Sequence, residues 1–150
     1  MVYNRDVVVN CLKRYYDLFV RMAYIEPDIV QQPPLDGWND EQLDVDSLRA
    51  HGFTENVIGL LRHIPYLKKK PNVHTTEVWI YTEPLSYLRT GNIFTGREKE
   101  SCRGRDEDGC LLSPFEVSMP RSFIPLTFGR EATWWVIDTD QGMDPSAGTA

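Results

Sequence analysis

RDVVVNCLKRYYDLFVRM, residues 5–22, contains the pattern that sets the first element of the fold. Apolar residues recur in it at spacings of three and four, as they do on one face of an amphipathic helix. They are Val8, Cys11, Leu12, Tyr15, Leu18, Phe19 and Met22. Asn4 is a good amino-terminal cap, and Asp6 suits the positive end of the helix dipole. We expect a helix from residue 5 that ends before Pro27, because proline lacks the amide hydrogen of a helical residue.

The segment PPLDGW, residues 33–38, follows this helix. Its paired prolines favour extended, polyproline-like backbone. Flexible linkers rarely contain so many apolar residues, since Ile29, Val30, Leu35 and Trp38 lie close together here. We therefore expect an ordered crossing segment, called the strap, that Trp38 pins against the core.

Two short helices are predicted after the strap. The first covers residues 45–51 and stops at Gly52, which can adopt the left-handed conformation of a helix end. Thr54 caps the second, residues 55–63, and Pro65 prevents it from continuing. The apolar stripe of this second helix consists of Val57, Ile58, Leu61 and Ile64.

The hydrophobic period then changes from helical to alternating. In TEVWIYT, residues 76–82, Val78 and Ile80 alternate with Trp79 and Tyr81, which predicts a strand.

Strand character resumes at residues 122–128, where Pro125 indicates an edge position or a bulge. A surface loop is expected over 97–109, and residues 133–138 form the last predicted strand. Helices first and strands afterwards favour the α+β class, with the N-terminal helices packed on one face of a mostly antiparallel sheet. We expect a single domain, 1–150, that is mainly helical over 1–67 and mainly strands over 75–142, with a tail at 143–150.

The composition indicates a globular chain. Hydrophobic residues make up 41% of its 150 residues and charged residues 25%, which excludes the disordered and fibrous classes. Its 16 basic and 22 acidic residues give a net charge of −6, so a nucleic-acid partner is not expected, because its phosphates would be repelled. No apolar run approaches the roughly 20 residues that span a bilayer, so we expect no membrane insertion.

The cysteines Cys11, Cys102 and Cys110 are few and odd in number. An oxidising compartment would favour more of them in an even number, so we expect a cytoplasmic or nuclear protein with free thiols. Cys102 and Cys110 flank the charged loop CRGRDEDGC, whose geometry would permit them to pair. The sequence leaves open whether they do.

TWWVIDTDQG, residues 133–142, carries two aspartates that invite comparison with a metal loop. A calcium loop of the EF-hand type needs glycine at its sixth position, a bidentate glutamate at its twelfth and flanking helices. Counted from Asp138, Met143 and Thr149 occupy those positions, and the flank is a strand, so we expect no metal site. Asp138 is expected instead to end the strand and bond nearby backbone amides, with Gly142 at a positive φ.

No catalytic constellation stands out in the sequence. Asp138 and Asp140 lie two apart on a turn, whereas a general acid–base pair needs two distinct environments in a cleft. His63 and His51 lie at predicted helix ends, where their charge would suit the dipole, and neither they nor His74 show metal spacing. The sequence also lacks a nucleophile motif and a phosphate-binding glycine motif. We expect no catalytic residues and no cofactor.

Three stretches of the chain resemble one family. PPLDGW, GFTENVIGLLRHIPYL and FIPLTFGREATWWVIDTDQG are similar to segments of a family of uncharacterised proteins from filamentous fungi. The shared features are a proline-rich Gly-Trp strap at 33–38, a VI-x-LLRH-x-PYL helix end at 57–67 and a TWWV-x-DT-x-G hairpin at 133–142. The resemblance covers most of the chain and implies no function.

The last third also resembles the C-terminal part of the SUKH superfamily, through residues 123–126 and 135–142. That group includes fungal cell-wall and signalling regulators and bacterial toxin-immunity proteins. The resemblance implies a SUKH-like α+β fold, with helices against a curved sheet, and protein binding without catalysis. The chain departs from the pattern in its N-terminal Gly-Trp motif and after residue 142, where MDPSAGTA replaces the expected strand.

We therefore expect a non-catalytic intracellular protein-interaction module, with regulation as one role that it could serve. The alternative is a small cytosolic enzyme of the hydrolase kind, with its site between the Cys102–Cys110 loop and the helices. A deep cleft with convergent titratable groups would favour the enzyme, and a broad apolar patch would favour the binding module.

Strand alternation divides the aromatic residues between two faces. The face expected to pack on the helices holds Trp135, Ile137, Val78 and Ile80. The opposite face holds the candidate partner-binding residues, which are Trp79, Tyr81 and Trp134. This row binds a partner unless the strap covers it. The residues expected in the core are Leu12, Leu18, Phe19, Val57, Leu61, Ile80 and Ile137.

Overall fold

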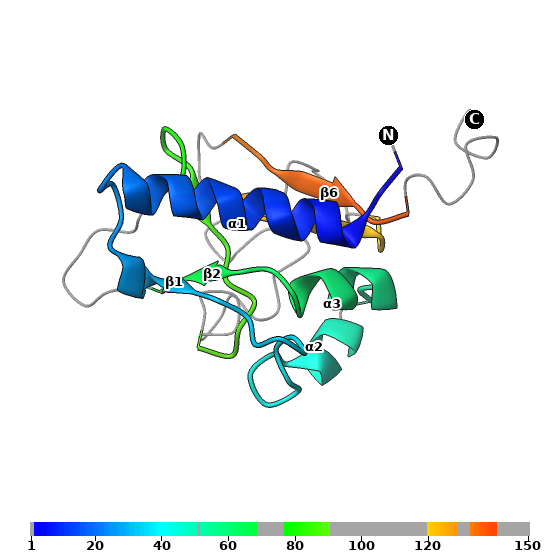
Figure 1. The fold of residues 1–150 in the computed structure, drawn as a ribbon. Helices are drawn as coiled ribbons and strands as arrows, with labels where there is room; N and C mark the ends of the chain where they lie inside the picture. Colours follow the sequence, from blue (N-terminus) through cyan, green and yellow to red (C-terminus); the bar gives the residue numbers. More distant parts are fainter. Residues whose placement is uncertain (1, 51, 69–76, 91–119, 129–132, 141–150) are drawn as a thin grey trace.

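The computed structural model describes residues 2–50, 52–68, 77–90, 120–128 and 133–140. The elements are α1 (Arg5–Arg21), a 3-10 turn η1 (Pro27–Ile29), β1 (Val30–Gln31), α2 (Val45–Ala50), α3 (Glu55–Leu61), β2 (Tyr66–Leu67), β3 (Glu83–Pro84), β4 (Phe123–Pro125), β5 (Thr127–Phe128) and β6 (Val136–Asp138). The strands form three antiparallel pairs, β1–β2, β3–β5 and β4–β6, so the fold combines helices with small antiparallel sheets. Figure 1 shows α1 alongside β6, with α3 and α2 on the other side of α1.

The start of α1 confirms the predicted cap. The Asn4 side chain accepts hydrogen bonds from the amides of Asp6 (3.0 Å) and Val7 (3.2 Å), two donors that the helix itself cannot satisfy. The helix ends at Arg21, before Pro27 as predicted.

The face that α1 buries is narrower than its apolar pattern. Val9, Leu12 and Tyr16 are buried, whereas Leu18 is 50% exposed, so the prediction that Leu18 belongs to the core is wrong. The apolar residues of this helix extend around more than one face, and packing against the rest of the chain buries only part of them. Leu18 lies on the flank that remains outside.

The strap is ordered and Trp38 pins it, as predicted. The indole of Trp38 is 7% exposed and donates to the Ile64 carbonyl at 3.0 Å, while its backbone amide donates to the Arg62 carbonyl at 2.8 Å. Gly37 has φ +85°, and a Cβ there would lie 2.9 Å from the same Arg62 oxygen. The strap therefore packs against the end of α3.

The two short helices agree with the sequence in place and in capping. Gly52 has φ +84° after α2, and the Thr54 hydroxyl accepts from the Val57 amide at 3.4 Å. α3 ends at Leu61, two residues earlier than predicted. The carbonyl of Arg62 is then available to the strap.

The strand predicted at 76–82 is wrong within its described part, because residues 78–82 form a tight turn. The Val78 amide donates to the Thr82 carbonyl at 2.9 Å, and the Thr82 amide donates to the Trp79 carbonyl at 3.1 Å. Tyr81 adopts φ +54°, a left-handed conformation that a strand does not contain. Ile80 is therefore 66% exposed at the turn and not in the core.

The C-terminal strands are shorter than predicted but lie where the pattern placed them. The predicted strand 122–128 is divided into β4 and β5 after Pro125, the position that indicated an interruption. β6 covers only the second half of the predicted strand 133–138.

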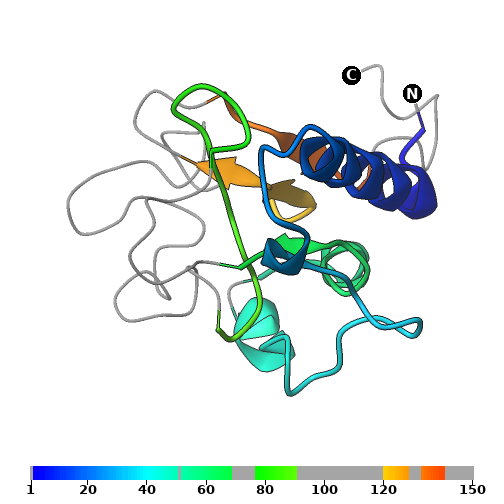
Figure 2. The same cartoon turned by 60° about the vertical axis from the view of Figure 1, so that its left-hand side comes forward.

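The core has two hydrophobic clusters. The larger is formed by α2, α3, residues around Tyr87 and Ile124 of β4, and the smaller by Tyr16, Ile29 and their neighbours. Figure 2 shows α1 and β6 side by side in the turned view, with α3 and α2 below them. Leu12, Val57 and Leu61 are buried as predicted, while Phe19 and Ile137 are only partly buried. Among the described helices, none is both long and apolar enough to cross a membrane.

Candidate functional site

Three consecutive large side chains lie exposed at the turn that replaces the predicted strand. Trp79, Ile80 and Tyr81, called here the aromatic turn, are 57%, 66% and 63% exposed. Figure 1 shows this segment, in green, projecting beyond α1 on the same side as β6. Isolated exposed apolar residues are common, but a contiguous group of them marks an interaction surface more often.

The base of the aromatic turn is fixed by contacts from distant parts of the chain. Val78 is 1% exposed, and its carbonyl accepts from the Tyr15 hydroxyl of α1 at 2.7 Å. Thr82 is fully buried, and its hydroxyl accepts from the Thr133 amide at 2.9 Å and donates to the Ile80 carbonyl at the same distance. The turn therefore presents its side chains on a backbone that is already ordered.

Two tyrosine hydroxyls support the segment that leads into the turn. Burial, and to a lesser degree the neighbouring Tyr24, raises the pKa of Tyr15, so this hydroxyl keeps its proton and donates. The Tyr24 hydroxyl donates to the Glu77 carbonyl at 3.0 Å. The Tyr24 side chain is itself 56% exposed and extends the apolar surface from the turn toward the end of α1.

Trp134 and Trp135 occupy different environments. The ring of Trp135 meets the ring of Tyr15 edge-on, with centroids 5.1 Å apart, and packs with Ile137 against the core. Trp134 is partly buried. Because Thr133 bonds Thr82, the segment that carries Trp134 lies next to the base of the aromatic turn. The structure thus brings the segments of all three candidate residues, Trp79, Tyr81 and Trp134, to one side of the molecule.

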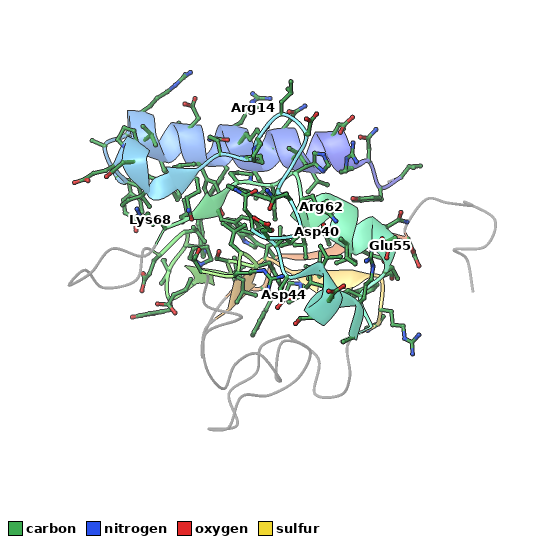
Figure 3. All side chains as sticks on the ribbon, turned by 90° about the horizontal axis from the view of Figure 1, so that it is seen from below. Arg14, Asp40, Asp44, Glu55, Arg62 and Lys68 are labelled. Carbon is green, nitrogen blue, oxygen red and sulfur yellow. The ribbon has the colours of Figure 1, made fainter. Side chains whose placement is uncertain are left out.

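The opposite side, viewed in Figure 3, is charged and carries several ion pairs. The Arg62 guanidinium donates to the Asp40 carboxylate at 2.5 Å, and Arg89 pairs with Asp44 at 3.2 Å. The Arg49 hydrogen bond lowers the pKa of Glu55 on the same side. These charges hold the loop after the strap and α2 in place, which accounts for them without a ligand.

Two of the hollows in the described part of the chain lie beside α1, and neither joins catalytic groups. One, of about 300 Å³, lies between the start of α1 and α3 and is lined by Tyr3, Asp6 and Glu55 among others. The other, of about 460 Å³, lies between α1 and the strap, and His63 lines it beside Asp6 and Lys13. One nitrogen of the His63 ring bonds the Gly59 carbonyl at 2.8 Å, and no serine or cysteine lines either hollow.

Asp138 behaves as the sequence predicts for a strand end. Its carboxylate accepts from the Asp140 amide at 3.0 Å and from the Ser122 hydroxyl at 3.1 Å. Among the residues with described positions, no group of three possible metal ligands occurs. Gly142, His51, His74 and the Cys102–Cys110 loop lie outside the described residues, so the predictions made for them stay predictions.

No family model, no curated protein and no solved structure matches the chain. Function is therefore inferred from the residues at the surface.

Sequence reasoning placed Ile80 in the core and missed its part in the surface. Alternation alone gave that assignment, and the run contains none of the Gly, Pro, Asn or Asp residues that usually mark a tight turn. The hydroxyl of Thr82 closes the turn instead, and a threonine after an aromatic run gives no warning of this in a single sequence.

Proposed function

We propose that this chain is a non-catalytic protein-interaction module that contacts its partner through the aromatic turn. The observation that carries the proposal is the combined exposure of Trp79, Ile80 and Tyr81 on a backbone that hydrogen bonds already fix. Aromatic side chains provide a large contact area at a small cost in conformational entropy, and they are enriched among residues that dominate binding energy.

The ordered backbone also supports this role. A loop that must order on binding loses affinity to its own conformational entropy, whereas a preformed turn does not. The proposal agrees with the SUKH-like character that the C-terminal pattern implies, since that resemblance points to protein binding, and it includes a cytoplasmic or nuclear location. Regulation of the bound partner is the role that such a module would serve.

The test replaces the exposed rings and measures partner capture. The double variant Trp79→Ala/Tyr81→Ala should keep the melting temperature of the wild type, because both side chains are mostly exposed. It should lose the proteins that the wild type captures by cross-linking in its native cells, as identified by mass spectrometry.

Leu35→Ala is the matched control. Leu35 is 99% exposed on the strap, away from the turn, so its loss removes a similar apolar contact from another surface. It should leave capture unchanged. If the double variant captures the same proteins as the wild type, the turn is not the binding surface.

A further inference from the structure

β6 has a described strand on one side only. It pairs with β4 through residues 123–125 and 136–138. Past the two ends of this pairing, the Leu126 amide donates to the Trp135 carbonyl at 2.7 Å and the Thr139 amide donates to the Ser122 carbonyl at 2.9 Å. Hydrogen-bonded and non-hydrogen-bonded pairs alternate in an antiparallel ladder. Residues 135, 137 and 139 therefore direct their backbone groups toward β4.

By the same alternation, the amides and carbonyls of Val136 and Asp138 point away from β4. The opposite strand agrees, because the carbonyl of Pro125, the partner of Val136, points away from β6 and accepts from the Tyr87 hydroxyl at 2.6 Å. No described strand lies along this outer edge. Figure 1 shows the edge and the aromatic turn on the same side of α1. An edge of this kind is a template for an added strand.

The charge around this edge selects the partner. Residues 77–88 and 133–140 contain four carboxylates, Glu77, Glu83, Asp138 and Asp140, and no basic residue. Arg121, just before β4, offsets part of this charge at one end, and α1, which lies alongside β6, adds four basic and two acidic residues. The sum over these segments stays negative, as it does for the whole chain at −6, so a basic segment is favoured over an acidic one.

We infer that the outer edge of β6 binds an extended segment of a partner protein, rich in lysine or arginine, as an added strand beside residues 134–138. The inference rests on the proposed function and names its partner class. Backbone hydrogen bonds to Val136 and Asp138 supply the register. Apolar side chains of the segment lie beside Val136 and reach the aromatic turn, and its basic side chains lie beside Asp138.

The first step of the test selects ligands without knowledge of the natural partner. A phage-displayed library of random dodecapeptides is panned on the full chain. Peptides that lack proline and carry an apolar and a basic residue two positions apart, on one face of a strand, should be enriched, and their binding should weaken as salt is added. Enrichment of acidic peptides, or of none beyond the background, overturns the inference.

The second step asks whether the selected peptide binds as a strand. N-methylation of one amide at a time should reduce its affinity at every second position by about tenfold, the effect of one lost hydrogen bond with added steric conflict. Methylation of the intervening amides should have little effect. Uniform or absent effects overturn strand addition.

The third step changes the protein. Val136→Pro removes an amide that points away from β4, a position where an edge strand tolerates proline, and should lower affinity by about tenfold or more. Val136→Ala keeps the amide and is the control for the lost side chain. If Val136→Pro fails to fold, the methylated peptides still decide the question.

The remaining outcomes separate the two proposals. Binding that requires Trp79 and Tyr81 but has the same affinity with Val136→Pro and with N-methylated peptides overturns strand addition and leaves the proposed function standing. Binding that is weakened by Val136→Pro and by N-methylation but is unchanged in the Trp79→Ala/Tyr81→Ala variant overturns the proposed function and leaves strand addition standing. A second copy on this edge would appear as a dimer in sedimentation, and residues 141–150 as the occupant would appear as tighter peptide binding after truncation at Asp140. The dimer and the tighter binding after truncation would each overturn the inference.

Discussion

The strap and the aromatic turn each carry a tryptophan in a connecting segment, and they use it in opposite ways. Trp38 is 7% exposed, and its indole nitrogen donates to a buried carbonyl, whereas Trp79 is 57% exposed. In both segments the backbone is fixed by hydrogen bonds. The strap therefore uses its aromatic ring for stability, while the order of the turn depends on Val78 and Thr82 and leaves its rings at the surface. The comparison shows that an ordered loop does not need to bury its largest side chains.

The largest expected effect is on the strap. Trp38→Ala removes a buried ring and leaves the Ile64 carbonyl without its donor, so it should lower the free energy of unfolding by about 3–5 kcal/mol. Urea denaturation followed by circular dichroism measures this. A loss below about 0.5 kcal/mol, the size typical of surface substitutions, would show that the strap is not pinned by this residue.

Gly37→Ala should have the next largest effect, on the order of 1–3 kcal/mol. The residue has φ +85°, and its new Cβ would approach the Arg62 carbonyl oxygen to 2.9 Å. Gly59→Ala is the matched control, because nothing lies within 4 Å of a Cβ at that position in α3. It should raise stability by roughly 0.5–1 kcal/mol, since alanine favours a helix over glycine. Equal effects of the two substitutions would contradict the described strap.

Thr82→Val tests the base of the turn. The substitution keeps the shape of a fully buried side chain but leaves the Thr133 amide without its acceptor, at a cost of about 1–3 kcal/mol. Hydrogen exchange of the Thr133 amide should accelerate in the variant. Unchanged exchange would mean that water or another group already protects that amide.

The smallest effect is expected at the turn itself. Trp79→Ala should change the free energy of unfolding by less than about 0.5 kcal/mol, because the ring is mostly exposed. When Trp79→Ala and Trp38→Ala are measured under the same conditions, the difference between their losses in free energy of unfolding compares an exposed tryptophan with a buried one. A loss of similar size in both variants would mean that the ring of Trp79 is covered in solution.

The sequence could predict the elements whose signals are local. The cap of α1 by Asn4, the helix stop at Gly52 and the interruption of a strand at Pro125 each depend on one residue and its neighbours, and all three are present. The pinning of the strap by Trp38 followed from the density of apolar residues around it. Such signals do not need the rest of the fold.

The turn could not be predicted because its determinants are distant in sequence. The Tyr15 hydroxyl reaches Val78 across 63 positions, and the Thr133 amide reaches Thr82 across 51. Residues 78–81 have high strand propensity, and tertiary contacts override it. Strand alternation predicted Trp79 and Tyr81 as candidate residues, because it placed them on the outer face of a strand. In the structure they are exposed for another reason, since they lie on a turn.

Trp135 packs against both hydrophobic clusters. Its ring is thus shared between the part of the molecule around α3 and the part around the end of α1. When either cluster opens, the ring loses the support that holds it against the other, so the free energies of opening of the two clusters are coupled. The consequence is cooperativity: one indole links the folding of the strap's surroundings to that of the residues beneath the aromatic turn, and the two are expected to melt in a single transition.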